Sequence, residues 1–201
     1  FKTFFGGGGW HAQPSPSRHS HNVEHLIELS LEQASSGVRK RLSLQTGARA
    51  RTVQVQIPPG VADGSRVRVA GKGERHSGGV GDLYLRIRLK PHAKFELKGR
   101  NIHVKISVRL TTAILGGEVD VPTLSKTTLR LKVPPATQPG QVFRLKEQGI
   151  PALGRSGASG DLYATLQVKL PGRLSAEARA HYEALAALEN EPKQTAKHSG
   201  K

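Results

Sequence analysis

The segment Gly71-Lys72-Gly73 has the glycine and lysine residues with which a phosphate-binding loop holds phosphate oxygens. In such a loop the lysine precedes a Ser or Thr whose hydroxyl binds magnesium, but Gly73 stands at that position. The first glycine of the loop pattern is replaced by Arg66. Glycines between two stretches of alternating apolar residues are typical of a β turn. We therefore predict a turn at this position and no nucleotide site.

Two other groups of residues have types that metal sites and enzymes use. His19, His21 and His25 carry closely spaced imidazoles, which are common metal ligands, but the first two lie in a segment without a regular pattern. Asp82 and Asp161 each follow a glycine, with no paired carboxylate or nucleophile that would support general acid–base or covalent chemistry. Both are typical of turn residues. We predict no catalytic residues, no metal and no other cofactor, so the chain is not expected to be an enzyme.

The two aspartates belong to a segment that occurs twice in the chain. Gly81-Asp82-Leu83-Tyr84 returns unchanged as Gly160-Asp161-Leu162-Tyr163, displaced by 79 positions. Further positions return at a displacement of 76: Ile57-Pro58-Pro59-Gly60 as Val133-Pro134-Pro135-Ala136, then Gly64, Arg68 and Gly73 as Gly140, Arg144 and Gly149. A repeat of this length predicts two tandem domains of one fold, with three extra loop residues in the second.

Each copy contains short stretches in which apolar and polar residues alternate, as in Leu83–Leu89 and Ile102–Leu110. One-sided alternation with Pro and Gly at the turns predicts antiparallel, sandwich-like domains, so the fold class is mostly β. Each copy also includes one helical turn closed by a glycine, Gly37 or Gly116. We assign residues 22–97 to the first β domain and residues 98–173 to the second.

The segments that flank the two domains have different patterns. Residues 1–21 are rich in Gly, Phe, Ser and Pro and are predicted to form a flexible linker, and residues 191–201 are predicted to be a disordered tail. Residues 174–190 form the single convincing helix, which Ser175 can cap and Pro192 ends. One stripe of this helix carries Tyr182, Leu185 and Leu188.

The composition limits the partners and the location. The 201 residues include 31 Lys and Arg against 15 Asp and Glu, a net charge of +16, which implies acidic partners such as nucleic acid or acidic peptides. Cysteine is absent, which excludes disulfides and cysteine-ligated zinc. No apolar run reaches the roughly 18 residues of a membrane span, and no signal peptide is apparent. A cytoplasmic protein without membrane contact is expected, and because the chain begins at Phe1 we expect a fragment or a processed product.

Together these residues resemble the C-terminal half of a DnaJ-type co-chaperone, the group that includes the curved-DNA-binding proteins. The resemblance covers residues 22–189 and rests on the doubled Pro-Pro and Gly-Asp-Leu-Tyr pattern. The run Leu115-Gly116-Gly117-Glu118-Val119-Asp120-Val121-Pro122-Thr123-Leu124 is similar to the signature of the second domain in that family. The His-Pro-Asp triplet of the J domain does not occur, so this chain alone is not expected to stimulate a DnaK-type ATPase. Because residues 45–49 form only a short loop, the chain resembles the zinc-free subclass.

The resemblance implies a groove in the first domain for extended segments of unfolded client polypeptides. Carried over by position, this groove would be lined by His25, Ile27, Leu42, Leu44 and Leu85. An extended client could add to a sheet edge, where its main chain supplies affinity and the groove selects apolar side chains. From the pattern alone, ordinary core is the favoured interpretation, because alternating aliphatic residues in a strand are usually core.

The resemblance also implies two protein partners. Arg39, Lys40 and Arg41 correspond to basic residues that hold the acidic tail of the DnaK-type chaperone, although the run is also typical of a solvated surface. The stripe of Tyr182, Leu185 and Leu188 would pair two chains in a homodimer, unless the helix folds back on its own domain.

A second hypothesis of function is binding of DNA, which the net charge and the curved-DNA-binding branch of the family favour. Phosphates would then contact the basic strand faces of Arg66, Arg68, Arg86 and Arg88. Few aromatic residues are available for base stacking, and no helix-turn-helix pattern is apparent. Our primary hypothesis is therefore a client-binding co-chaperone module.

Overall fold

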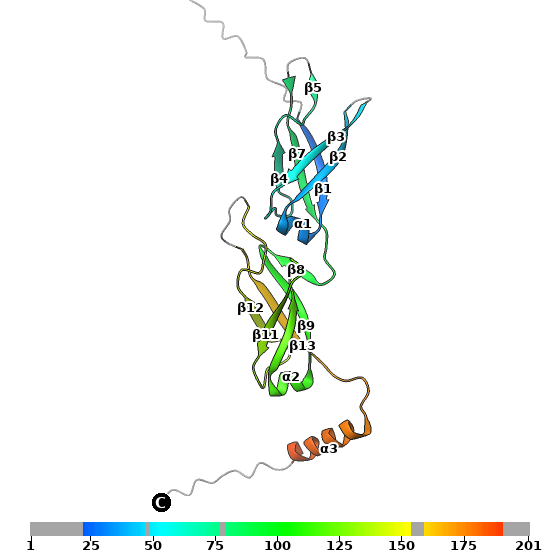
Figure 1. Ribbon diagram of the computed structural model, residues 1–201, viewed down its shortest axis with the longest axis vertical. Helices are drawn as coiled ribbons and strands as arrows, with labels where there is room; N and C mark the ends of the chain where they lie inside the picture. The colour runs from blue at the N-terminus through cyan, green and yellow to red at the C-terminus, as the bar shows by residue number, and fades with distance from the viewer. Residues whose placement is uncertain (1–21, 47–48, 77–78, 154–158, 191–201) are drawn as a thin grey trace, which may run out of the picture.

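The computed structural model describes residues 22–46, 49–76, 79–153 and 159–190, which form two β domains followed by a helix (Figure 1). The predicted linker, 1–21, and the predicted tail, 191–201, lie outside the described residues. The helices that the structure describes are each too short or too polar to span a lipid bilayer. The mostly β fold class predicted from the alternating patterns is confirmed.

The first domain consists of a three-stranded sheet, a β hairpin that packs on one face of it, one helical turn and a small two-stranded sheet. Its elements are β1 (Val23–Leu29), α1 (Leu31–Ser36), β2 (Val38–Thr46), β3 (Arg49–Ile57), β4 (Arg66–Val69), β5 (Arg75–His76), β6 (Gly79–Val80) and β7 (Leu83–Leu89). The sheet has the order β1-β7-β4, β2 pairs with β3, and β5 pairs with β6. Alternation places one side chain in two toward the hairpin. Leu29, Val55, Ile57 and Leu83 are among the residues of the aliphatic core that results.

The second domain repeats this arrangement with a fourth strand in its main sheet. Its elements are β8 (Phe95–Lys98), β9 (Asn101–Arg109), α2 (Leu110–Leu115), β10 (Gly117–Pro122), β11 (Thr128–Val133), β12 (Val142–Leu145) and β13 (Leu162–Lys169). The sheet has the order β12-β13-β9-β8, and β10 pairs with β11 as a hairpin. Ile102, Leu162 and Leu166 are completely buried in its core.

The central strand pair of each domain corrects the prediction of antiparallel domains. β1 runs parallel to β7 with Val23 opposite Leu83, and β9 runs parallel to β13 with Ile102 opposite Leu162. A parallel pair needs a long connection between its strands. Here the helical turn, the hairpin and the following edge strand supply that connection, and apolar alternation within a single strand does not reveal the direction of its neighbour.

The helical turns agree with the sequence prediction. α1 and α2 are each followed by a glycine with positive φ, 72° at Gly37 and 81° at Gly116. A Cβ on Gly37 would lie 2.9 Å from the carbonyl oxygen of Ile57, so a larger residue does not fit there. In α1, Ser30 and Gln33 form a reciprocal capping box, which fixes the point at which β1 turns into the helix.

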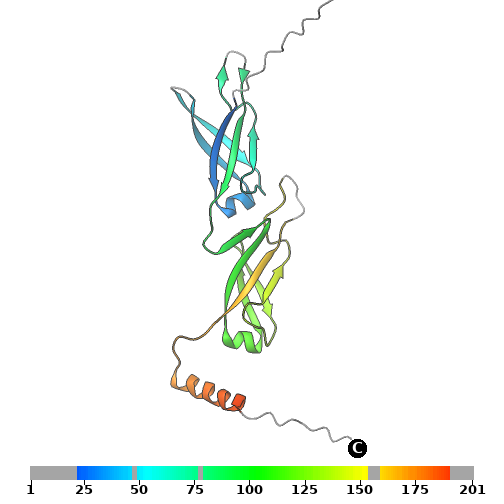
Figure 2. The same cartoon turned by 180° about the vertical axis from the view of Figure 1, so that it is seen from behind.

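The boundary between the domains differs from the expected division at residues 97 and 98. β8 spans this expected boundary, and it pairs with β9 and completes the second sheet. Leu31 of α1 is buried in the core cluster of the second domain, and a Cβ on Gly60 would lie 2.5 Å from the carbonyl oxygen of Pro151. The two domains therefore meet in a close contact, which both views show below α1 (Figures 1 and 2).

The last element, α3 (Ala176–Asn190), stands apart from both sheets (Figure 2). Ser175 caps it as predicted, since its Oγ accepts a hydrogen bond of 3.1 Å from the backbone N–H of Ala178. None of the residues of α3 is buried, and Leu185 and Leu188 are 52% and 63% exposed. Within this single chain, the apolar stripe of the helix has almost nothing to pack against.

Candidate functional site

The five residues predicted to line the groove lie on the inner side of the first domain, on three strands. Their exposure divides them into two groups. Ile27, Leu44 and Leu85 are only 4%, 3% and 0% exposed and belong to the core. His25 and Leu42 are half-buried, so both can be reached from outside. The accessible part of the site therefore consists of these two residues above a closed apolar floor.

Free backbone at this site is present on β1 and on β2. In the described part of the chain, β1 pairs with β7 on one side only, and β2 pairs only with β3. An unpaired strand edge presents rows of N–H and C=O groups that another extended segment can bind. Apolar side chains and a free edge thus occur together on β1.

The three consecutive cations of β2 do not form one cluster. Lys40 lies on the inner side of β2 with Leu42, and its Nζ donates a hydrogen bond of 2.9 Å to the carbonyl oxygen of Glu28 on β1. Arg39 and Arg41 are exposed on the opposite face of β2, where they lie beside Gln56 and Gln54 of β3. Lys40 alone among the three therefore lies at the gap between β1 and β2.

The two aspartates hold turns, as the sequence predicted. Asp82 Oδ2 lies 2.7 Å from Nε of Arg68, its Oδ1 accepts a hydrogen bond from the N–H of Gly71, and its own N–H donates to Oδ1 of Asn22. The N–H of Gly71, followed by the Arg68 guanidinium, holds the pKa of Asp82 below its ordinary value. This carboxylate ties three chain segments together.

Asp161 repeats this arrangement in the second domain. Its Oδ2 lies 2.7 Å from Nε of Arg144, and its backbone N–H donates to Oδ1 of Asn101. The backbone N–H of Glu147 donates to its Oδ1 and is the main cause that lowers the pKa of Asp161, with the Arg144 guanidinium acting in the same direction. The repeat in the sequence is thus also a repeat of side-chain contacts.

The glycine-rich segment at residue 71 is a turn that is joined to β3. The guanidinium of Arg51 donates to the carbonyl oxygens of Lys72 and Gly73. A Cβ on Gly73 would lie 2.4 Å from the carbonyl carbon of Gly81, so only glycine fits at this position. The close approach of two backbones explains the glycine without any phosphate ligand.

The histidines form no metal centre in the described part of the chain. No group of three His, Cys, Asp or Glu side chains there is arranged to hold an ion. His25 lies alone on β1, and His19 and His21 lie outside the described residues.

The basic outer face of the first domain is largely neutralised by acids. Arg66, Arg68 and Arg88 lie 3.8, 2.7 and 3.9 Å from carboxylates of Glu24, Asp82 and Glu28. Arg66 also lies over the ring of Tyr84, with 4.6 Å between the guanidinium and the ring centroid. Arg86, the fourth arginine predicted on this face, is exposed and takes part in none of the ion pairs among the described residues. A phosphate backbone would therefore compete with acids at three of the four arginines.

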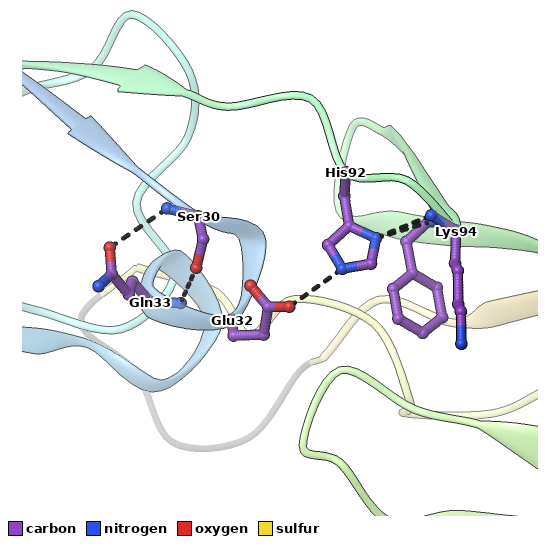
Figure 3. Close-up of polar contacts among 6 residues, drawn as sticks. Ser30, Glu32, Gln33, His92 and Lys94 are labelled. Carbon is purple, nitrogen blue, oxygen red and sulfur yellow. Dashed lines mark hydrogen bonds and ion pairs between the residues drawn. The ribbon is translucent and has the colours of Figure 1, made fainter.

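One further polar contact joins the domains at the base of the site (Figure 3). Nε2 of His92 lies 3.1 Å from Oε1 of Glu32 on α1, and Nδ1 of the same ring accepts hydrogen bonds from the N–H groups of Lys94 and Phe95. This geometry fixes the proton of the neutral ring on Nε2. Sequence reasoning missed both residues because they lie sixty positions apart and belong to no motif.

Of the three residues predicted to form a dimer contact on α3, only Tyr182 lies beside apolar residues of the second domain. Tyr182 lines a cavity of about 380 Å³ at the end of the second domain, together with Leu110 and Leu170. Leu185 and Leu188 are not among the residues that line it, and both are exposed.

A duplicated β domain with an open strand edge above an apolar floor has the architecture of a module that can bind an extended polypeptide segment. The chain belongs to the DnaJ C terminal domain family, whose sequence model matches residues 23–171. Curated relatives include the proteins named Chaperone protein DnaJ from Brucella canis, Brucella suis and Brucella abortus. Each is 43% identical over 148 residues, which make up 71% of this chain and 39% of the relative. The chain thus spans about two fifths of the length of these relatives.

Proposed function

We propose that this chain is the client-binding part of a DnaJ-type co-chaperone. It would bind extended apolar segments of unfolded polypeptides at the first domain and deliver them to a DnaK-type chaperone in the cytoplasm. The observation that carries this proposal is the pair of half-buried residues His25 and Leu42 beside the unpaired edge of β1. Membership in the DnaJ C terminal domain family supports it further.

The size of the site predicts weak binding. A client that buries one large apolar side chain against His25 and Leu42 would gain about 1.5–3 kcal/mol. Main-chain hydrogen bonds along one strand add about 0.5–1.5 kcal/mol each. Such a site suits transient capture and release of many sequences, and two copies on one particle would gain from effective concentration.

The finer features of the proposal concern the subclass. β2 and β3 pair continuously from Val38 opposite Ile57 to Thr46 opposite Arg49, so little chain remains between them for a zinc module. The sequence also contains no cysteine. We assign the chain to the zinc-free subclass, and the residues described here are not expected to stimulate a DnaK-type ATPase by themselves.

The experiment that tests client binding is a fluorescence anisotropy titration of a labelled leucine-rich peptide at low and high salt. Leu42→Asp is expected to abolish binding without loss of folding, because Leu42 is half-buried. Leu26→Asp is the matched control, since Leu26 lies on the outer face of β1 and is 52% exposed. Equal loss of binding in both variants, or binding that disappears with salt and ignores Leu42, would refute the groove and favour the alternative of DNA binding.

A further inference from the structure

The main sheet of the second domain has an outer face that its own hairpin does not cover. Its four strands have the order β12-β13-β9-β8. On β9, Ile102, Val104 and Ile106 are buried in the core that the β10–β11 hairpin shares, so the alternate side chains point to the opposite, outer face. Lys105 and Ser107 are exposed on this outer face, which is therefore open at its centre.

The two domains differ in the charge that they place on this face. β1 pairs with β7 and β9 pairs with β13 in the same register, displaced by 79 positions. The two acids of β1, Glu24 and Glu28, are therefore replaced on β9 by His103 and Ser107. Neither β9 nor β13 contains an acidic residue. The glutamates that pair with arginines in the first domain thus have no counterpart on these two strands.

Four cations of the outer face are free of ion pairs. Lys94 directly precedes β8, Lys105 and Arg109 lie on β9, and Lys169 lies on β13. All four are exposed, and none takes part in an ion pair among the described residues. Lys169 lies directly opposite Arg109 in the strand pair. Like charges at opposite positions of a sheet repel each other, so an anion bound between them would relieve this repulsion.

Acids approach the outer face only at its margins. On the edge strand β8, Nζ of Lys98 lies 3.3 Å from a carboxylate oxygen of Glu96. Next to the start of β13, Asp161 binds Arg144 at 2.7 Å. The centre of the face and the end at Arg109 therefore keep a positive charge that an anionic ligand can neutralise.

Two aromatic rings lie side by side on the central strands of this face. His103 of β9 and Tyr163 of β13 are opposite each other, and their rings stack with 5.0 Å between centroids and 14° between planes. In the first domain the guanidinium of Arg66 lies over the equivalent Tyr84, whereas Val142 stands at the position of Arg66 and cannot supply this cover. One class of RNA-binding domain likewise stacks bases on aromatic residues of a four-stranded sheet.

The aromatic pair borders a cavity on the outer face. The cavity has a volume of about 550 Å³, and its lining includes His103 and three lysines, Lys94, Lys98 and Lys105. A second cavity shares Thr165 with the first and continues along β13 to Lys169. Aromatic and cationic side chains therefore border one path across the sheet.

We propose that the outer face of the second domain binds single-stranded RNA. A base in the first cavity would lie against His103 and continue its stack with Tyr163, while phosphates contact the four cations without ion pairs. A duplex keeps its bases stacked inside and cannot use the aromatic pair. This surface lies on the other domain from the proposed client site, so the inference does not depend on client binding.

Uncharged polar side chains on the path favour RNA over DNA. Ser107 and Gln167 lie opposite each other, between the positions of Lys105 and Arg109, and both are exposed. Their hydroxyl and amide groups can form hydrogen bonds with the 2′-hydroxyl of a ribose, which is the group that distinguishes RNA from DNA.

The first test measures the electrostatic part of binding. A labelled oligouridine of about ten nucleotides is titrated with the full chain at several salt concentrations, and fluorescence anisotropy is recorded. Four phosphate contacts predict that log K falls with log salt with a slope of about −3, because each contact to a single strand contributes about 0.7. Lys105→Gln and Lys169→Gln should each weaken binding and reduce this slope by about 0.7.

The matched control is Arg86→Gln, which removes one charge from an exposed arginine of the first domain that has no ion pair among the described residues. It should leave the affinity and the slope nearly unchanged. If Arg86→Gln weakens binding as much as Lys105→Gln does, the overall charge of +16 attracts the RNA and the proposed surface is overturned.

The second test measures stacking. His103→Ala should weaken binding roughly 5- to 150-fold without a change in the salt slope, since removal of one base–aromatic stack has an effect of this size. His103→Phe keeps an aromatic ring and should retain most of the affinity, and thermal denaturation checks that both variants are folded. Unchanged binding by a folded His103→Ala variant would overturn the stacking site.

Two competitors test the kind of nucleic acid. Oligothymidine and duplex DNA of the same length are each expected to bind several-fold more weakly than oligouridine at the same salt concentration. Equal binding of oligothymidine would overturn the assignment to RNA, and tighter binding of the duplex would overturn the single-stranded site. The leucine-rich peptide should bind to the Lys105 and His103 variants as it does to the parent chain, so failure of this inference is distinguishable from failure of the proposed function.

Discussion

Oε1 of Glu32 lies 3.1 Å from Nε2 of His92, and this contact joins the helical turn of the first domain to the segment that leads into β8 of the second. The opposite nitrogen of the ring accepts hydrogen bonds of 3.0 and 3.1 Å from the N–H groups of Lys94 and Phe95. One imidazole therefore holds the start of β8 and the end of the first domain at the same time.

Replacement of this imidazole should loosen the joint between the domains. His92→Ala leaves two amides without their acceptor, and a lost hydrogen bond of this kind costs about 1–2 kcal/mol. The melting temperature is expected to fall by about 2–4 °C for each kcal/mol lost. Glu32→Gln, which keeps an oxygen acceptor for Nε2–H, is the matched control and should have the smaller effect in differential scanning calorimetry. An equal loss in both variants would contradict this account.

Acid should destabilise the chain through the two repeated aspartates. The pKa values of Asp82 and Asp161 are both held below the ordinary value of 3.8 in the folded state. Groups with depressed pKa values contribute stability above their unfolded pKa, and this contribution is lost as pH falls through the folded pKa. In urea denaturation, the free energy of unfolding should therefore fall as the pH is lowered from about 5 to about 2, the range in which these two carboxylates become protonated. In Asp82→Asn and Asp161→Asn the slope should be shallower, and a slope identical to that of the parent chain would refute this assignment.

Glycine should be essential at the two equivalent positions 73 and 149. A Cβ would lie 2.4 Å from the carbonyl carbon of Gly81 in the first case and 2.5 Å from that of Gly160 in the second. Gly73→Ala and Gly149→Ala must displace backbone and are expected to cost about 1–3 kcal/mol, as overpacking does. Gly172→Ala, with open space around the position, serves as the neutral control in thermal denaturation. A neutral Gly73→Ala would contradict the close approach.

We expect the exposed stripe of α3 to pair two chains, as the resemblance implies. Leu185 and Leu188 are 52% and 63% exposed, and burial of each is worth about 1.5–3 kcal/mol. Analytical ultracentrifugation should give twice the chain mass of 21.6 kDa for the parent chain. Leu185→Glu and Leu188→Glu should give the single mass, whereas Glu189→Gln should not. A monomeric parent chain at micromolar concentration would rule the pairing out.

Docking of an acidic chaperone tail should depend on Lys40 and not on its neighbours. Lys40 lies at the gap between β1 and β2, while Arg41 is exposed on the other face of the hairpin. Lys40→Glu should weaken binding of an acidic peptide far more than Arg41→Glu, which changes the net charge equally. Equal weakening of the two variants in an anisotropy titration would mean that the overall field of the chain, rather than a site, attracts the peptide.

Local features were predictable from the sequence because their causes are local. The cap at Ser175, the glycines that close α1 and α2, and the turn role of Asp82 each depend on a few neighbouring residues. The parallel direction of β1 and β7 could not be predicted from the sequence, because the paired residues of these strands are about sixty positions apart. The membership of β8 in the second sheet depends likewise on a hairpin at Gly99 that alternation alone does not place.

The candidate site was predictable in position more than in detail. Ile27, Leu44 and Leu85 share a face with His25 and Leu42, as their spacing implied, but exposure depends on which strand covers them. The sequence could have predicted that Lys40 lies on the opposite face of β2 from Arg39 and Arg41. Alternate residues of a strand share a face, so Lys40 lies on the same face as Leu42 and Leu44.

The burial of Leu31 in the core of the second domain has a consequence for chimeras and for the inheritance of the two copies. A recombination between relatives that exchanges the first domain also exchanges one side chain of the second domain's interior. A smaller residue at that position would leave a cavity, which costs about 2–5 kcal/mol for a leucine truncated to alanine. The two domains are therefore expected to keep their stability only when they are transplanted together as a single unit.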